Sequence, residues 1–156
     1  MDEHPEAGLV FGLICLPIYI CMKKFDNYCR NLAVLQTAKD QDTANEFIIS
    51  GIIKKFYIQF ELGWKVLKEL LLYEGSVRAK TGSPREIIKE AYRYYSCMDE
   101  DVWLSMLSQR NNMAHLYDGE AAKELMNRIL SEYIPAFQQL EKSILNRYKD
   151  LLESME

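Results

Sequence analysis

The amino-acid sequence predicts an all-α protein, an antiparallel up-and-down bundle of four to five helices. Two observations carry this prediction. Apolar residues recur at spacings of three and four over most of the chain, and helix caps or a closing glycine separate these segments. No alternating strand pattern or internal repeat accompanies them. With 156 residues, of which 49% are hydrophobic, the chain suits one compact domain with a buried core.

The first helix is expected over residues 23–39. Phe25, Tyr28, Leu32 and Leu35 follow one another at spacings of three and four residues. This spacing places the four side chains on one face of a helix, which predicts that this face packs against the rest of the bundle.

A long second helix is expected from residue 43 to about residue 74. Thr43 and Glu46 have the spacing of a capping box at its start, and Gly75 is suited to its end. We expect Gly51 and Gly63 to allow close packing. The helix carries a wide apolar stripe, which is typical of the central member of a bundle. This stripe comprises Phe47, Ile49, Ile52, Ile53, Phe56, Phe60, Trp64, Leu67 and Leu71.

Capping signals also divide the second half of the chain. Ser83 is suited to cap a third helix, with Pro84 at its first position. Asp99 predicts the start of a fourth helix and Asp118 the start of a fifth. Pro135 lies within the fifth helix and should kink it, because proline lacks a backbone donor.

Composition excludes several classes of protein. Because 19 Lys and Arg residues face 23 Asp and Glu, the net charge is −4, and no broad basic surface for duplex nucleic acid is expected. Cys15, Cys21, Cys29 and Cys97 contain no CxxC pair, and their spacing fits neither a zinc site nor a disulfide framework. We therefore expect no metal and a reducing, cytoplasmic setting.

Residues 1–21 differ from the rest of the chain. The run from Leu9 to Cys21 is nearly all apolar, but it is too short to span a bilayer and Pro17 interrupts it. Its acidic flank also differs from the basic flank of a secretory signal. We therefore expect an N-terminal extension that does not enter a membrane, followed by a helical bundle domain over residues 22–150.

One short segment carries the chemistry. Arg110 and Asn111 are followed by His115, the only histidine outside the extreme N-terminus, and by Tyr117. Arginine is a permanent cation that fits phosphate oxygens, histidine exchanges protons near neutral pH, and tyrosine offers a hydroxyl that can be modified. The segment therefore predicts a phosphate-handling site.

Helix geometry restricts how this segment works. On one straight helix, Arg110 and His115 would lie about 140° apart at 100° per residue. They would then face one ligand poorly. We therefore expect the helix to end or distort between them, or a second copy of the chain to complete the site across a twofold axis. A cleft at a helix end is predicted.

The segment from Arg110 to Tyr117, with a polar residue directly after the arginine, resembles the signature of the HEPN superfamily. It looks most like the HepT-like branch, also called nucleotidyltransferase substrate-binding proteins. The resemblance covers about residues 22–145 and includes three more short matches in order, at residues 60–65, 83–86 and 103–107. It implies a HEPN-like helical bundle, a homodimer with its site at the dimer cleft, and a small nucleotidyltransferase as partner.

The side chains and the resemblance together predict a metal-independent endoribonuclease without a cofactor, the toxin of a HEPN/MNT toxin–antitoxin pair. RNA cleavage requires proton transfer, which we assign to His115, and stabilisation of phosphoryl charge, which we assign to Arg110. Asn111 would orient a side chain or the substrate. The resemblance implies that the MNT-type antitoxin adds AMP units to Tyr117, and the added negative charge would block the site.

Several alternatives remain open. One alternative function is a non-catalytic subunit that binds a nucleotide or substrate for its nucleotidyltransferase. A second alternative is a structural helical adaptor. Glu61 is either an acid that holds Arg110 or a buried carboxylate capped by Lys65 or a tyrosine, and it receives no catalytic role. The tyrosine-rich stretch of residues 92–95 either stacks on bases or belongs to the core or a dimer contact.

Overall fold

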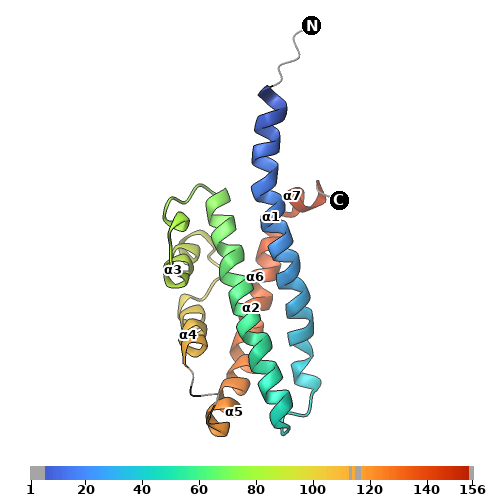
Figure 1. Ribbon diagram of the computed structural model, residues 1–156, viewed down its shortest axis with the longest axis vertical. Helices are drawn as coiled ribbons and strands as arrows, with labels where there is room; N and C mark the ends of the chain where they lie inside the picture. Colours follow the sequence, from blue (N-terminus) through green and yellow to red (C-terminus); the bar gives the residue numbers. More distant parts are fainter. Residues whose placement is uncertain (1–5, 113, 115–116, 155–156) are drawn as a thin grey trace.

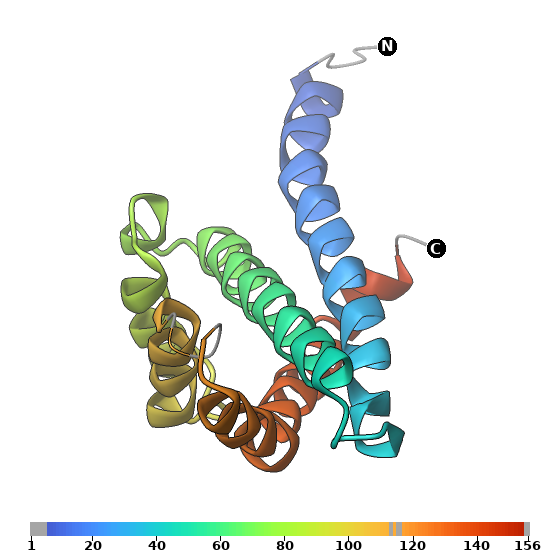
Figure 2. The ribbon, with the colours of Figure 1, turned by 60° about the horizontal axis from the view of Figure 1, so that its bottom comes forward.

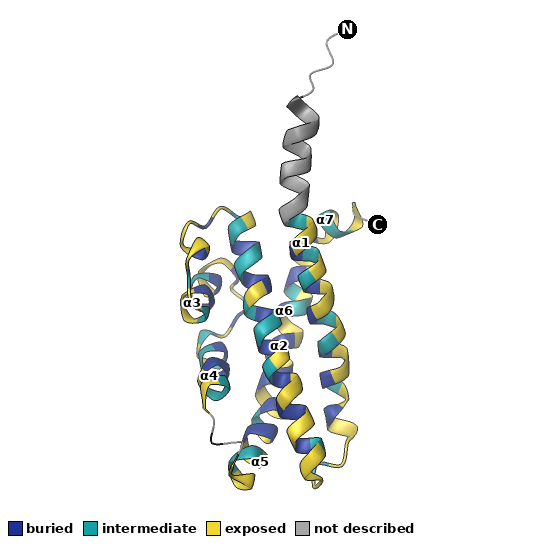
Figure 3. Ribbon diagram, in the orientation of Figure 1, coloured by how far each residue is buried: buried dark blue, intermediate teal, exposed yellow. Residues whose placement is uncertain are grey.

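A computed structural model of the chain is all-helical and confirms the predicted bundle (Figure 1). It describes residues 6–112, 114 and 117–154, and side chains of these residues from 18 onward. No strand occurs in this part of the chain. Figure 3 shows that the buried residues lie on the faces where the helices meet.

Helices α1 (Glu6–Leu35) and α2 (Glu46–Tyr73) form a long antiparallel hairpin, which a 3-10 turn (Gln36–Asp40) connects. Helix α2 is the central helix, as predicted, because it packs against α1 on one side and against the helices that follow it on the other (Figure 2). These later elements are a 3-10 turn (Arg78–Lys80), α3 (Pro84–Tyr94), α4 (Glu100–Asn111), α5 (Gly119–Arg128), a π-helical turn (Ile129–Tyr133), α6 (Ile134–Arg147) and α7 (Lys149–Glu153).

Aromatic side chains fill the core between α1, α2, α4 and α6. The Phe56 ring stacks on Tyr133 with centroids 5.1 Å apart, and the Trp103 ring meets Phe137 edge-on at 5.5 Å. The buried Tyr28 hydroxyl donates to the Phe137 carbonyl over 2.7 Å, so no polar atom of this ring is left without a partner. Each such ring contributes about 2 kcal/mol by its burial. The core therefore fixes the positions of α2 and α4.

Most of the predicted caps are confirmed. Ser83 and Glu86 form the capping box of α3, and Pro84 takes the first turn. The Asp99 carboxylate accepts the Val102 amide at the start of α4. Asp118 caps α5 in the same way. The end of α2 is also as expected, because the glycine after it adopts a φ of 88°.

The cap of α2 corrects the sequence prediction. Thr43 was expected to start this helix, but the cap is Asn45, whose Oδ1 accepts the amides of Phe47 at 2.9 Å and Ile48 at 3.4 Å. Asparagine offers a fixed carbonyl oxygen next to the first helical residue. Thr43 lies too far ahead of Glu46 to reach those amides.

Two residues of α2 do not pack as predicted. Phe47 was expected in the apolar stripe but is 90% exposed. At about 100° per residue it lies roughly 200° around the helix from Ile49, which places it on the opposite face. Gly51 was expected at a close contact, but a Cβ there would meet nothing within 4 Å. The prediction for Gly63 is confirmed, since a Cβ would lie 3.0 Å from the Trp103 ring.

Helix α1 begins earlier than predicted. A helix starting at residue 23 was expected, whereas α1 begins at Glu6 and continues through Pro17. Proline removes a single backbone donor, and the bonds before and after it continue the helix. None of the helices, within the part of the chain that the structure describes, is long and apolar enough to cross a membrane.

The predicted kink at Pro135 appears as a π-helical turn. Pro135 has no N–H for the carbonyl four residues earlier. The chain widens just before it, over Ile129–Tyr133, and the Ile134 amide bonds to the carbonyl of Ile129, five residues back. The predicted fifth helix is therefore divided into α5 and α6.

Candidate functional site

The candidate site begins where α4 ends. Helix α4 stops at Asn111, inside the predicted motif, which confirms that the helix ends between Arg110 and His115. Asn112 is extended, and its Oδ1 accepts the Ala114 amide at 3.0 Å. Arg110 is in the last turn, where a cation complements the negative end of the helix dipole. His115 lies outside the described residues.

A carboxylate from α2 holds Arg110. One Nη of Arg110 donates to Oε1 of Glu61, and its other Nη donates to Oδ1 of Asn111 at 3.4 Å. The second oxygen of Glu61 accepts the Trp64 indole N–H at 3.1 Å, and the Lys65 ammonium lies 3.7 Å from it. Glu61 therefore holds Arg110, as the first alternative predicts, and also lies beside Lys65, but its side chain is 28% exposed and not buried as the second alternative predicts.

This ion pair orients Arg110 more than it stabilises the fold. The Arg110 side chain is 33% exposed and that of Glu61 28% exposed. A pair this accessible to water contributes about 0–1 kcal/mol to the free energy of unfolding. The Trp64 indole fixes the carboxylate, and the carboxylate in turn fixes one edge of the guanidinium. The remaining donors of Arg110 have no partner among the residues that the structure describes.

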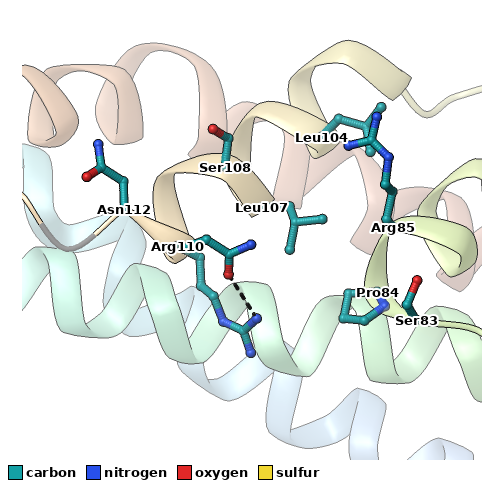
Figure 4. A pocket seen from close by; sticks show the side chains of 9 residues that line it. Ser83, Pro84, Arg85, Leu104, Leu107, Ser108, Arg110 and Asn112 are labelled. Carbon is teal, nitrogen blue, oxygen red and sulfur yellow. Dashed lines mark hydrogen bonds between the residues drawn. The ribbon is translucent and has the colours of Figure 1, made fainter.

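Arg110 lines a groove between α3 and α4 with a volume of about 580 Å³. Figure 4 shows residues 83–85, at the start of α3, on one side and α4 on the other. The lining combines apolar side chains, among them Leu104 and Leu107, with the polar side chains of serines, asparagines and two arginines. The α4 side comprises Leu104, Leu107, Ser108, Arg110 and Asn111, and Asn112 follows.

Tyr117 lies on a different surface. Its side chain is 89% exposed, and its amide donates to the Ala114 carbonyl at 3.1 Å in the turn before α5. It lines a second hollow of about 320 Å³, between the first turn of α5 and residues 46–50 of α2. The described structure therefore brings Arg110 and Asn111 to one groove and places Tyr117 beside another.

Sequence reasoning missed Arg85 as a groove residue. Its segment was explained by helix capping and by the family resemblance, so the arginine received no role of its own. Ser108 was missed as well, because a single serine on a helix carries no signal. Only the packing of α3 beside α4 brings these residues to the rim that Arg110 shares.

The tyrosines of α3 divide between surface and core. Tyr92 is 46% and Tyr94 36% exposed, whereas Tyr95 is buried and its hydroxyl lies 2.8 Å from that of Tyr148. Within the described residues, no three His, Cys, Asp or Glu side chains gather closely enough to hold a metal ion.

The structure is an all-helical bundle in which an arginine at the end of a helix lines a groove. These are the features that the sequence motif predicts. The chain belongs to the family described as nucleotidyltransferase substrate binding protein like, whose model it matches over residues 23–146. It is also similar to a protein of Haemophilus influenzae named probable ribonuclease HepT. The two are 30% identical over 102 residues, which cover 64% of this chain and 67% of that protein.

Proposed function

We propose that this protein is a HepT-like toxin, a metal-independent endoribonuclease of a HEPN/MNT pair. The observation that carries the proposal is the position of Arg110, which Glu61 orients at the rim of an open groove. An arginine with free donors in such a groove suits a phosphate of a long, flexible chain. The family and the name of the Haemophilus influenzae relative support this reading.

The proposed reaction is a transfer within the RNA strand. The ribose 2′-hydroxyl loses its proton to a base and its oxygen attacks the adjacent phosphorus. The bond from phosphorus to the 5′ oxygen then breaks, and that oxygen takes up a proton. We assign the proton transfers to His115 and the growing charge on the phosphoryl oxygens to Arg110. Asn111 orients Arg110, to which it is hydrogen-bonded.

We further propose that the active form is a homodimer. In a twofold assembly the ends of two α4 helices would face one RNA strand, and two Arg110 and two His115 side chains would converge. This local positive charge would offset the net charge of −4 on each chain.

The proposed switch is the AMPylation of Tyr117 by a partner minimal nucleotidyltransferase. The phenolic oxygen attacks the α-phosphorus of ATP, pyrophosphate leaves and the phenolic proton goes to solvent. The exposure of Tyr117, 89%, gives a modifying enzyme access to the hydroxyl. Each added phosphodiester carries one negative charge, which would compete with RNA for Arg110 and His115.

RNA cleavage in excess chelator tests the proposed reaction. We expect wild-type protein to cut RNA, and Arg110→Ala and His115→Ala each to lose this activity. His4→Ala is the matched control, because it removes the only other histidine, and it should cut at the wild-type rate. Intact RNA with wild-type protein under varied conditions would contradict the proposal.

Intact-mass measurement tests the proposed switch. After co-expression with a minimal nucleotidyltransferase of the proposed partner type, the wild-type chain should gain AMP-sized increments that Tyr117→Phe lacks. Tyr92→Phe is the control, because that tyrosine is also exposed. An unchanged wild-type mass, or increments that persist in Tyr117→Phe, would rule out modification at this position.

The family description favours one other function, a non-catalytic subunit that binds a nucleotide or substrate. Arg110 and His115 would then hold a phosphate without breaking a bond. Tight nucleotide binding together with intact RNA would support this function. A purely structural adaptor predicts that none of these substitutions changes anything except stability.

A further inference from the structure

The geometry points to Arg85 as a second phosphate-binding residue, which holds an RNA phosphate next to the one that is cleaved. This inference rests on the proposed function and adds a substrate contact to it. Arg85 is exposed in the first turn of α3 and lines the same groove as Arg110 (Figure 4).

The two arginines differ in how their charge is compensated. Glu61 neutralises Arg110 through a direct hydrogen bond. Arg85 forms no salt bridge or hydrogen bond with any residue that the structure describes. The acidic residue nearest to it in sequence, Glu86, turns its carboxylate to the Ser83 amide at 2.7 Å, and this hydrogen bond lowers the pKa of Glu86. Arg85 therefore supplies the uncompensated positive charge of the groove.

The rest of the groove suits a polyanion. None of its described lining residues is acidic. Ser83 and Ser108 bring hydroxyls, and Asn111 and Asn112 bring amides, which bind phosphate and sugar oxygens. A groove that runs from Arg110 to Arg85, across two helices, is open enough to follow a strand past the reacting phosphate. A ligand with a single phosphate would contact only one end of this groove, so the length of the groove favours a strand with several phosphates.

The interaction predicts a loss of affinity that depends on salt. Removing one cation from the binding surface should weaken binding of single-stranded RNA about tenfold at low salt. It should also lower the slope of log K against log salt by about 0.7, the value for one phosphate contact on a single strand. In cleavage kinetics KM should rise and kcat should stay within about twofold, because this contact forms equally in the ground state.

The test uses a fluorescent 2′-O-methyl RNA oligonucleotide, which cannot be cleaved, with the full chain and anisotropy as the readout. Arg85→Ala should bind about tenfold more weakly, and Arg85→Lys should recover part of the affinity. Arg93→Ala is the matched control, since Arg93 lies on the same helix but is paired with Glu90. Circular dichroism melting confirms that each variant is folded.

The outcomes separate this inference from the proposed function. If wild-type protein cleaves RNA and Arg85→Ala binds with wild-type affinity and salt slope, the inference is wrong and the proposed function stands. If Arg93→Ala weakens binding equally, the effect is general charge and the inference is again wrong. If wild-type protein binds AMP through Arg85 but does not bind or cut RNA, both fail and the binding-subunit function replaces them.

Discussion

Two glutamates, Glu61 within α2 and Glu74 directly after its last residue, each hold an arginine, and the two clusters differ in what surrounds that arginine. At the end of the helix, Glu74 accepts the Tyr148 hydroxyl at 2.8 Å and pairs with Arg147 at 3.5 Å. The Arg147 guanidinium lies over the Tyr95 ring, 5.1 Å from its centre. A tyrosine ring therefore covers this arginine, and a tyrosine hydroxyl is bound to its carboxylate.

In the middle of α2, the Glu61 cluster leaves its arginine open to a groove. Side-chain exposure does not separate the two, because Arg110 is 33% exposed and Arg147 45% exposed. What differs is the neighbour on the free side of the guanidinium, which is a groove for Arg110 and a tyrosine ring for Arg147. The ion pair of Glu74 with Arg147 therefore serves the fold. In the ion pair of Glu61 with Arg110, the arginine is left available to a ligand.

The largest expected difference between the clusters is in activity. Arg110→Ala should lower kcat/KM for RNA cleavage at least about 100-fold, because the charge on the phosphoryl oxygens loses its partner. Arg147→Ala should leave cleavage unchanged and lower the free energy of unfolding by about 0.5 kcal/mol. Cleavage assays and urea unfolding of both variants measure this contrast. Equal effects on cleavage would remove the distinction between the clusters.

Substitution of Glu61 should also reduce activity more than substitution of Glu74. Glu61→Gln keeps a hydrogen-bond acceptor but loses the charge that orients Arg110, so we expect kcat to fall about tenfold with KM nearly constant. Glu74→Gln, at the C-cap of the same helix, is the matched control and should leave both constants unchanged. A fall in stability without a change in kcat would assign Glu61 a purely structural role.

The two tyrosines of the Glu74 cluster, Tyr95 and Tyr148, should affect stability and not cleavage. Tyr148 is 4% exposed, and its hydroxyl connects Glu74 with Tyr95. Tyr148→Phe removes these two hydrogen bonds and should lower the free energy of unfolding by about 1 kcal/mol. Urea unfolding near neutral pH measures the loss, and the cleavage rate at the same pH should not change. A loss of cleavage would show that the two clusters are coupled.

A further difference between the clusters is expected only at alkaline pH. Burial raises the pKa of Tyr95 from 10.0 to about 12. The folded state therefore favours the protonated phenol, and this contribution to stability is complete below pH 10 and is lost as pH rises toward 12. Unfolding midpoints at pH 8, 10 and 11 should fall in wild type and fall less steeply in Tyr95→Phe. Parallel curves would exclude Tyr95 as the source.

Local signals predicted most of the fold. The caps at Ser83, Asp99 and Asp118 were correct because a cap depends on residues within one turn of a helix. The prediction of Thr43 as the cap of α2 was wrong because two residues suited to capping lie close together. The choice between Thr43 and Asn45 depends on where the first turn of the helix forms. Amphipathic spacing described the core well, except at Phe47, which lies on the opposite face of α2 from Ile49.

The candidate site was predictable only in part. The motif selected Arg110 and Asn111 and indicated that their helix ends before His115. The contact with Glu61 stayed open because the two residues are 49 positions apart, and local patterns carry no information at that distance. Arg85 was missed for the same reason.

The sequence by itself determined the helical class, most helix boundaries and the end of α4, because capping, spacing and proline act within a few residues. Tertiary structure alone decided which charges meet. Packing of α4 against α2, with Trp103 buried beside Phe60, places Glu61 against Arg110. Packing of α3 beside α4 brings Arg85 to the same groove. A groove forms where side chains from distant segments meet, so its composition depends on the packed core.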